Sequence, residues 1–335
     1  MGLLRPAVGG ARSDSYSSTT VGDVVTGATD RGLLVLADGA QTAFAAGAVA
    51  EFARFGVSWR RGAGAGLGAH VALLALLGEA PEAERRWRRQ AELGCPLFRS
   101  RLAAVRERLG EAAGVSVAVD AWTLAGWLDD EALAEHLAPE MAAAPERLAR
   151  AGAGLTVAVE DLAAGRSAWV ELAGVDAAEA GGLLRAAAAF PGGWGPQVVP
   201  GGRWTGPVWG GVGAALGGGA PWAGDALSWD VVCGFPVPAL ARPALGGSLV
   251  ELMQRRSEAR AGAEVEGWLA AGAGRELRII APDAAVWRAW SGRDAAEIGV
   301  EYPLPWERNG ELTAGVLACG AAAAKLALGE GPRQG

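Results

Sequence analysis

The strongest constraint on the fold is an alternation of short apolar runs, glycine-containing turns and helical segments near the amino terminus. Residues 33–36 are four consecutive aliphatic side chains, typical of a buried strand, and a small-residue segment after them continues as a helix through Phe55. A second short strand around 57–59 leads into the glycine-rich turn 64–68, and residues 69–77 form a buried helix. Strand, turn and helix repeated in this order predict an α/β fold with a mainly parallel central sheet flanked by helices.

The turn Gly64-Ala65-Gly66-Leu67-Gly68 has the spacing of a nucleophile elbow, Gly-x-Ser-x-Gly, with glycine in the place of the serine. In a hydrolase, that serine oxygen forms the covalent bond to the acyl carbon, and glycine has no side chain that could replace it. This sequence pattern alone is a weak signal, because the chain contains 52 glycines. The neighbouring segments therefore decide whether this turn is an elbow.

A second turn, Ala-Asp-Gly-Ala-Gln-Thr at residues 37–42, follows the first strand. Together, the two turns resemble the patatin-like phospholipase family, in which a Gly-Gly-Gly-x-Arg/Lys-Gly loop supplies the oxyanion hole and the elbow serine works with one aspartate. On that resemblance, Gly39 alone remains of the three leading glycines, Gln41 replaces the basic residue, and Thr42 replaces the last glycine. Asp38 would add a negative charge beside the site meant for an oxyanion.

The resemblance extends over roughly residues 31 to 325 and implies a three-layer patatin-like domain at 31–330, preceded by a flexible polar arm at 1–30. The family's catalytic aspartate, about a dozen residues after a Phe-Pro-Gly turn, falls on Gly206. Further segments are similar to the family's strand hairpin, its helix end and turn, and its last two core strands, at residues 155–172, 184–192, 228–233 and 277–283.

A rival alignment places the base on Asp230. Asp230 is followed by Pro-Val-Pro at 236–238, which imitates the family's Asp-Gly-Gly…Pro-x-Pro segment with Val231 and Val232 in place of the glycines. This alignment leaves the strand at 228–233 without a counterpart. Under either alignment the serine is missing, and a base without a nucleophile performs no acyl transfer.

The loss of both dyad residues predicts a pseudoenzyme with a non-hydrolytic function. Such a protein would bind a lipid or another apolar small molecule, or act as a scaffold or regulator for a protein partner or a second copy of itself. The alternative is a patatin-class lipid acyl hydrolase, or a repurposed enzyme that uses other groups of the same cleft. The candidate cleft residues are Asp38, Gly39, Gln41, Gly64, Gly68, His70, Trp194, Trp204 and Trp209.

Tryptophan is unusually frequent, with 14 Trp against 2 Tyr and 6 Phe. Several tryptophans fall in or just after the Gly/Pro-rich stretch 191–224, which is expected to be a long loop. They could cap the sheet, plug or line the old cleft, or present a protein-binding face. His70 is either a hydrogen-bonded core residue or a cleft residue that pairs with Asp38. The arginines at 85–89 form either a solvated helix face or a contact for phospholipid head groups or an acidic partner.

Composition narrows the classes of partner, metal site and cellular compartment that the chain can have. The net charge of −7 and a pI near 5.1 disfavour a nucleic-acid or anionic-membrane surface. Two histidines and no Cys-x-x-Cys pair leave no material for a zinc site, and we expect no metal and no cofactor. Cys95, Cys233 and Cys319 are typical of reduced core residues in a cytoplasmic protein. Lys325 is the only lysine among many arginines, which suggests a GC-rich bacterial genome.

The amino terminus lacks the pattern of a signal peptide, and the longest apolar runs are too short to span a bilayer, so no transmembrane segment is expected. Apolar periodicity predicts further helices at residues 80–92, 98–111, 130–150, 176–189, 246–260 and 307–328.

Overall fold

A computed structural model describes residues 31–100, 128–141, 143–189, 193–199, 202–205, 228–235, 276–282 and 308–329, together with Val237, Gly262, Ala263 and Val265. The arm at 1–30, the predicted helix at 246–260, most of the predicted helix at 98–111, Gly206 and Trp209 lie outside these residues.

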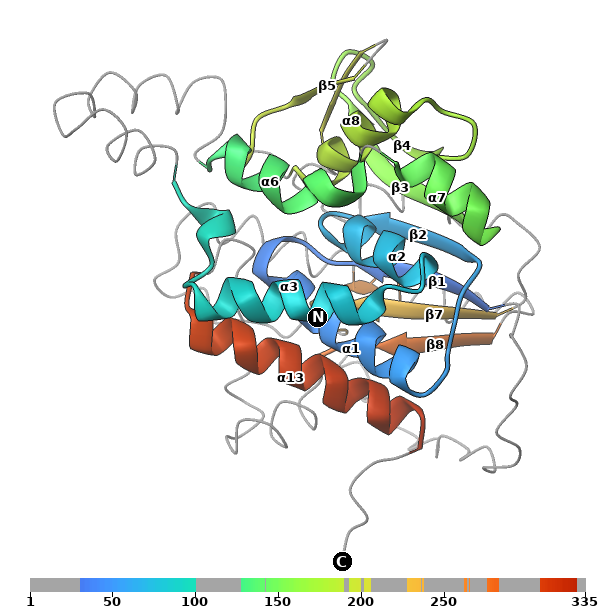
Figure 1. The fold of residues 1–335 in the computed structure, drawn as a ribbon, viewed down its shortest axis with the longest axis vertical. Helices are drawn as coiled ribbons and strands as arrows, with labels where there is room; N and C mark the ends of the chain where they lie inside the picture. The colour runs from blue at the N-terminus through green and yellow to red at the C-terminus, as the bar shows by residue number, and fades with distance from the viewer. Residues whose placement is uncertain are drawn as a thin grey trace, which may run out of the picture.

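The described strands form one mixed, mostly parallel sheet (Figure 1). Its order is β5-β6-β3-β2-β1-β7-β8, and β4 also pairs with β3. Five neighbouring strands run parallel, in the order β3, β2, β1, β7 and β8, while β4 and β6 are antiparallel to β3. The strands are β1 (Arg31–Leu36), β2 (Arg61–Ala65), β3 (Gly154–Asp161), β4 (Arg166–Glu171), β5 (Gln197–Val199), β6 (Gly202–Thr205), β7 (Ser228–Cys233) and β8 (Glu276–Ile280).

Both faces of the sheet are buried. In β1, Leu33 and Val35 belong to one hydrophobic cluster and Leu34 and Leu36 to another, as the two-residue period of a strand requires. Figure 1 shows α1, α3 and α13 in front of the parallel strands, on the side of the first cluster. This α/β arrangement confirms the predicted fold class and is consistent with three layers.

The helices mostly follow the predicted ranges. They are α1 (Thr42–Arg54), α2 (Gly68–Leu76), α3 (Ala80–Glu92), α6 (Asp130–Met141), α7 (Ala144–Ala151), α8 (Ala177–Ala188) and α13 (Gly310–Ala327), with short 3-10 turns at Gly39–Gln41 and Pro96–Phe98. The single helix predicted at 130–150 is wrong, because Pro145 starts a second helix, α7. None of the helices in these described ranges combines the length and apolarity needed to cross a membrane.

One strand prediction and one loop prediction also need correction. The second strand is not at 57–59 but at Arg61–Ala65, and Trp59 instead packs in the core with its indole N–H donating to Asp230 at 2.8 Å. The stretch 191–224 is not wholly a loop, because β5 and β6 lie within it and pair with each other. Both errors have one cause: tertiary packing and short-range pairing outweigh weak local strand propensity.

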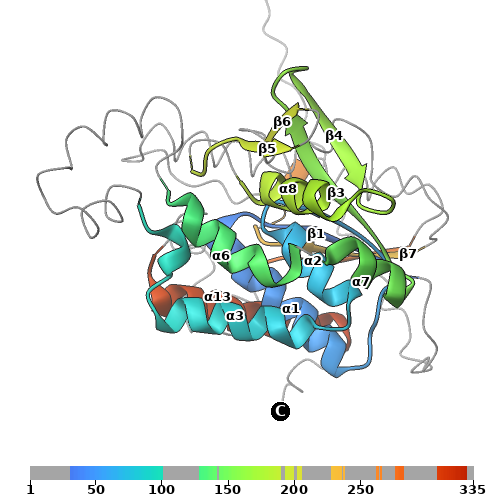
Figure 2. The same ribbon diagram turned by 45° about the horizontal axis from the view of Figure 1, so that its top comes forward.

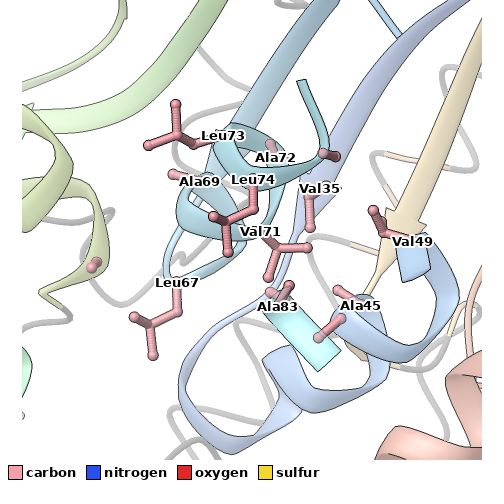
Figure 3. Packing of buried hydrophobic residues seen from close by; sticks show 14 of the residues in the cluster. Val35, Ala45, Val49, Leu67, Ala69, Val71, Ala72, Leu73, Leu74 and Ala83 are labelled. Carbon is pink, nitrogen blue, oxygen red and sulfur yellow. The ribbon is translucent and has the colours of Figure 1, made fainter. Parts of the chain in front are cut away.

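Glycines in β2 let α2 lie close against the sheet. A Cβ on Gly62 would lie 2.8 Å from a methyl carbon of Leu76, and a Cβ on Gly64 would lie 2.8 Å from the amide nitrogen of Ala69. These approaches explain why a sequence as glycine-rich as Arg-Gly-Ala-Gly-Ala forms a buried strand. Figure 3 shows side chains of β1, α1 and α2 meeting in the core that results.

Helices α1 and α13 also meet through glycine. A Cβ on Gly47 would lie 3.0 Å from the carbonyl carbon of Leu317, and a Cβ on Gly320 would lie 2.8 Å from the carbonyl carbon of Phe44. The two helices therefore pack backbone to backbone. This contact fixes α1, and with it the loop that connects β1 to α1.

Candidate functional site

The turn between β2 and α2 has the backbone geometry of an elbow. Gly66 has a φ of +63°, directly after the last residue of β2, and α2 begins at Gly68. A side chain at such a position is strained, and nucleophile elbows carry their serine in a strained strand-to-helix turn of this kind. The carboxyl end of β2 is thus shaped like an elbow but carries no side chain at its apex.

The loop after β1 fills the space above Gly66. A Cβ built on Gly66 would lie 2.8 Å from the carboxyl carbon of Asp38, and still closer to Asp38 Oδ1 and to the carbonyl oxygen of Ala37. Real Cβ atoms do not approach other atoms so closely. A serine at this position would therefore require movement of both the Asp38 side chain and the Ala37 backbone.

Backbone hydrogen bonds hold this loop in place. The Gly68 N–H, at the start of α2, donates to the carbonyl oxygen of Ala37 at 2.9 Å, and the Ala37 N–H donates to Ala65 at 3.4 Å. The Gln41 N–H donates back to the Asp38 carbonyl oxygen at 3.1 Å. The first turn of a helix normally offers N–H groups to an anion. Here one of those donors is already occupied by the protein's own carbonyl group.

Most residues of the two turns are buried. Gly39, Ala40, Gln41, Gly64 and Gly68 are all buried, whereas Asp38 is half-buried. A residue that the sequence did not single out, Gly234, lies beside them at the end of β7. Its N–H donates to Leu36 at 2.8 Å, and a Cβ on it would lie 2.7 Å from the Ala37 Cβ. A glycine directly after a buried strand is the signal that could have found it.

His70 lies in the first turn of α2 and is 4% exposed. Its ring packs edge-on against His136 of α6, with the ring centres 5.3 Å apart. His136 contacts Trp87 of α3, Trp87 contacts Phe98, and Phe98 contacts Trp194, with centre distances of 5.9 to 6.3 Å. The structure therefore places His70 at one end of a row of packed aromatic rings.

Two tryptophans of the candidate set, Trp194 and Trp204, lie in the part of the chain that the structure describes. Trp194 is 1% exposed, and its indole N–H donates to the carbonyl oxygen of Asp129 at 3.2 Å. Trp204 lies in β6, where its backbone is in register with Gln197 and Asp161. Trp209 and the predicted base position, Gly206, lie outside the described residues. The position of Trp194 agrees with a role in core packing.

Asp230 lies in the middle of β7 and is fully buried. Its carboxylate accepts hydrogen bonds from the guanidinium of Arg31 at 3.1 Å, from both Nε and Nη2 of Arg278 at 2.9 Å, and from Trp59 at 2.8 Å. Asp230 is level with Gly62 across the sheet. It is therefore four residues, or about 13 Å, from Gly66 along the strand direction.

Comparison with known proteins leaves the family undetermined. No protein-family model matches the chain, and no curated protein matches its sequence. Among solved structures, the chain is similar to VipD from Legionella pneumophila, with 11% identity and a TM-score of 0.43 over 90% of this chain and 67% of that chain. A TM-score below 0.5 does not identify a fold, so the patatin-like fold stays a prediction.

Within the described ranges, no group of three or more His, Cys, Asp or Glu side chains is arranged to hold a metal ion. The chemical content of the elbow region is thus a half-buried carboxylate, a histidine packed against aromatic rings, and backbone amides that are at least partly occupied by the chain itself.

Proposed function

We propose that this protein is a catalytically inactive, patatin-like protein that acts by binding, as a scaffold or regulator of a partner protein. The observation that carries the proposal is the closed turn at Gly66, where Ala37 and Asp38 occupy the volume that a nucleophilic side chain needs. Because Gly39, Ala40, Gln41 and Leu67 are buried by the protein's own atoms, a scaffold role is better supported than an apolar-ligand cleft at this turn.

Loss of the nucleophile removes covalent catalysis. Acyl transfer through a covalent intermediate needs an activated nucleophile, and a protease stripped of its catalytic residues keeps only about 10³-fold to 10⁴-fold catalysis over water. That residual catalysis depends on donors for the oxyanion. Here the Gly68 N–H donates to Ala37, and the Asp38 carboxylate would repel a developing negative charge nearby. The remaining catalytic effects are thus weakened as well.

The proposal is tested by treating the purified protein with a fluorophosphonate probe and by measuring turnover of short-chain and long-chain acyl esters. We expect no stoichiometric label and no turnover above the rate of heat-denatured protein. Stoichiometric labelling of any serine would contradict the proposal, and mass spectrometry of the labelled peptide would identify the true nucleophile.

A repurposed enzyme is tested separately with Asp38→Asn and with Glu135→Gln, a matched change at an exposed carboxylate on α6. Hydrolysis that Asp38→Asn abolishes and Glu135→Gln preserves would favour an enzyme over a scaffold.

Extraction of the native protein with organic solvent adds a third measurement. A stoichiometric acyl lipid in the extract would favour the ligand-binding function over the scaffold function.

A further inference from the structure

A groove of about 480 Å³ lies between the turn that joins α2 to α3, the first two turns of α3, the end of α6, and α7. Figure 2 shows α6 and α7 beside α2 and α3 on this side of the molecule. The volume falls in the range of small-molecule sites. The polar lining residues are Glu79, Glu82, Arg85, Arg86 and Arg147.

The charged residues of the groove are held in place by one another. Arg147 donates to Glu79 at 2.6 Å, and Arg86 donates to Glu82 at 2.8 Å and to the carbonyl oxygen of His136 at 3.2 Å. Arg85 forms an ion pair with Glu82. Among the described lining residues, three guanidinium groups stand against two carboxylates, a net charge of +1 in a chain whose net charge is −7.

Two of these arginines are partly withdrawn from water by the fold. The side chains of Arg86 and Arg147 are 18% and 24% exposed, whereas the Arg85 side chain is 74% exposed. A guanidinium has five N–H donors in a rigid fork, so Arg85 and Arg147, which each pair with one carboxylate, have donors for a second acceptor. The groove also borders the first turn of α3, where the helix dipole favours negative charge.

The neighbouring arginines on α3 show that this arrangement is local. Arg88 pairs with Glu84 at 2.7 Å along the helix, its side chain is 59% exposed, and it is not among the residues that line the groove. Arg88 has the position expected of an ordinary solvated helix face. Arg85 and Arg86, by contrast, line the groove together with Arg147 of α7, although the Arg85 side chain is as solvated as that of Arg88.

From this geometry we propose that the groove binds a phosphate group, carried by a soluble compound or by a lipid head group, through Arg85 and Arg147, while Arg86 holds Glu82 in place. A monocarboxylate would offer these arginines nothing that Glu79 and Glu82 do not already provide. A phosphate carries more charge and more acceptor oxygens, so it can bridge guanidinium groups of α3 and α7 that no single glutamate joins. This site is independent of the turn at Gly66 and of the proposed scaffold function.

The test measures thermal unfolding of the full chain in rising millimolar concentrations of sodium phosphate or pyrophosphate, against sodium chloride of equal ionic strength. We expect a saturable rise in Tm with phosphate or pyrophosphate that chloride does not produce. Arg85→Gln and Arg147→Gln should each weaken the apparent affinity about tenfold or more, because each removes a charge-assisted hydrogen bond. Arg88→Gln is the matched control and should respond as the wild type does.

Cosedimentation with phosphatidylcholine vesicles, with and without phosphatidic acid, then separates the two sources of phosphate. Binding only to vesicles that contain phosphatidic acid, lost in Arg85→Gln, identifies a lipid head group, whereas a Tm rise without vesicle binding identifies a soluble phosphate compound. Equal responses in the wild type, Arg85→Gln and Arg147→Gln would overturn the proposal, as would no response to phosphate, pyrophosphate or vesicles. Arg85 is largely exposed, so Arg85→Gln keeps the test valid even where Arg147→Gln fails to fold.

Discussion

Two aspartates near the centre of the sheet, Asp38 and Asp230, have the same chemistry and opposite surroundings. Asp230 is fully buried within β7, and donors from Arg31, Trp59 and Arg278 surround its carboxylate. Asp38 is half-buried just beyond the neighbouring strand β1, where it covers the glycine at which a nucleophile would stand. The role of a carboxylate near a candidate site must therefore be judged by its partners and by the space it takes. Residue type alone does not distinguish the structural Asp230 from Asp38, which fills the turn.

The largest expected effect is on Asp230. Asp230→Asn leaves the partly buried Arg278 without its anionic partner and leaves Arg31 with only the exposed Glu276, so we expect the free energy of unfolding to fall by about 3–5 kcal/mol. Asp38→Asn, the matched change at the other aspartate, should lower it by about 1 kcal/mol or less. Urea unfolding followed by tryptophan fluorescence measures both values.

Equal losses in these two variants would break the comparison, because Asp38 would then have a structural role as important as that of Asp230. A small loss of unfolding free energy in Asp230→Asn, with an unchanged slope against urea concentration, would mean that the two arginines find other partners. Arg278 already lies over the ring of Phe52, with its guanidinium carbon 4.5 Å from the ring centre, and that contact should persist in Asp230→Asn.

Much of the fold could be predicted, because its signals are local. The apolar runs and helical periodicity predicted the strand at 228–233 and the helices at 80–92 and 176–189, each to within one residue. The prediction was wrong where local signals are weak. Strand β2 is glycine-rich because α2 approaches it closely, and that requirement is visible only when both elements are in place.

The candidate site could be predicted only in part. The turn at Gly66 follows from its glycine spacing and from the strand and helix on either side. That the carbonyl of Ala37 and the carboxylate of Asp38 fill this turn depends on two segments almost thirty residues apart, and no local pattern encodes it. The same holds for Trp194, since core, plug and surface positions are all compatible with a tryptophan in a Gly/Pro-rich stretch.

A smaller expected loss of stability comes from adding a side chain at Gly66, in the turn between β2 and α2. Gly66→Ser adds backbone strain and a steric conflict with Ala37 and Asp38, whereas Gly152→Ser adds the strain alone, because Gly152 has a φ of +62° with no atom near its Cβ position. We expect both variants to lose about 1–2 kcal/mol from the left-handed conformation, and Gly66→Ser to lose about 1–3 kcal/mol more from overpacking. Thermal and urea unfolding of the two variants give the difference.

The double variant Asp38→Gly, Gly66→Ser then separates the two parts of the conflict. Removal of the carboxylate should restore part of the stability lost in Gly66→Ser, but not all of it, because the Ala37 carbonyl oxygen remains in place. Equal losses in Gly66→Ser and Gly152→Ser would show that the loop moves aside freely. In that case the turn is open in solution, and Asp38 does not block it.

The smallest expected effect is the reactivity of the native thiols, which reports whether the carboxyl end of the parallel strands opens. Cys233 ends β7, and the Gly234 N–H beside it donates to Leu36 at the start of the Asp38 loop. Burial raises the pKa of Cys233 to about 12, so only about one molecule in ten thousand carries a thiolate there at pH 8. Cys95 and Cys319 are buried as well. We therefore expect no thiol of the native protein to react with Ellman's reagent at pH 8, and all three to react in denaturant.

Rapid reaction of Cys233 alone in the native protein would show that the carboxyl end of β7 opens while the fold persists. The Asp38 loop would then act as a gate above Gly66 and not as a fixed plug.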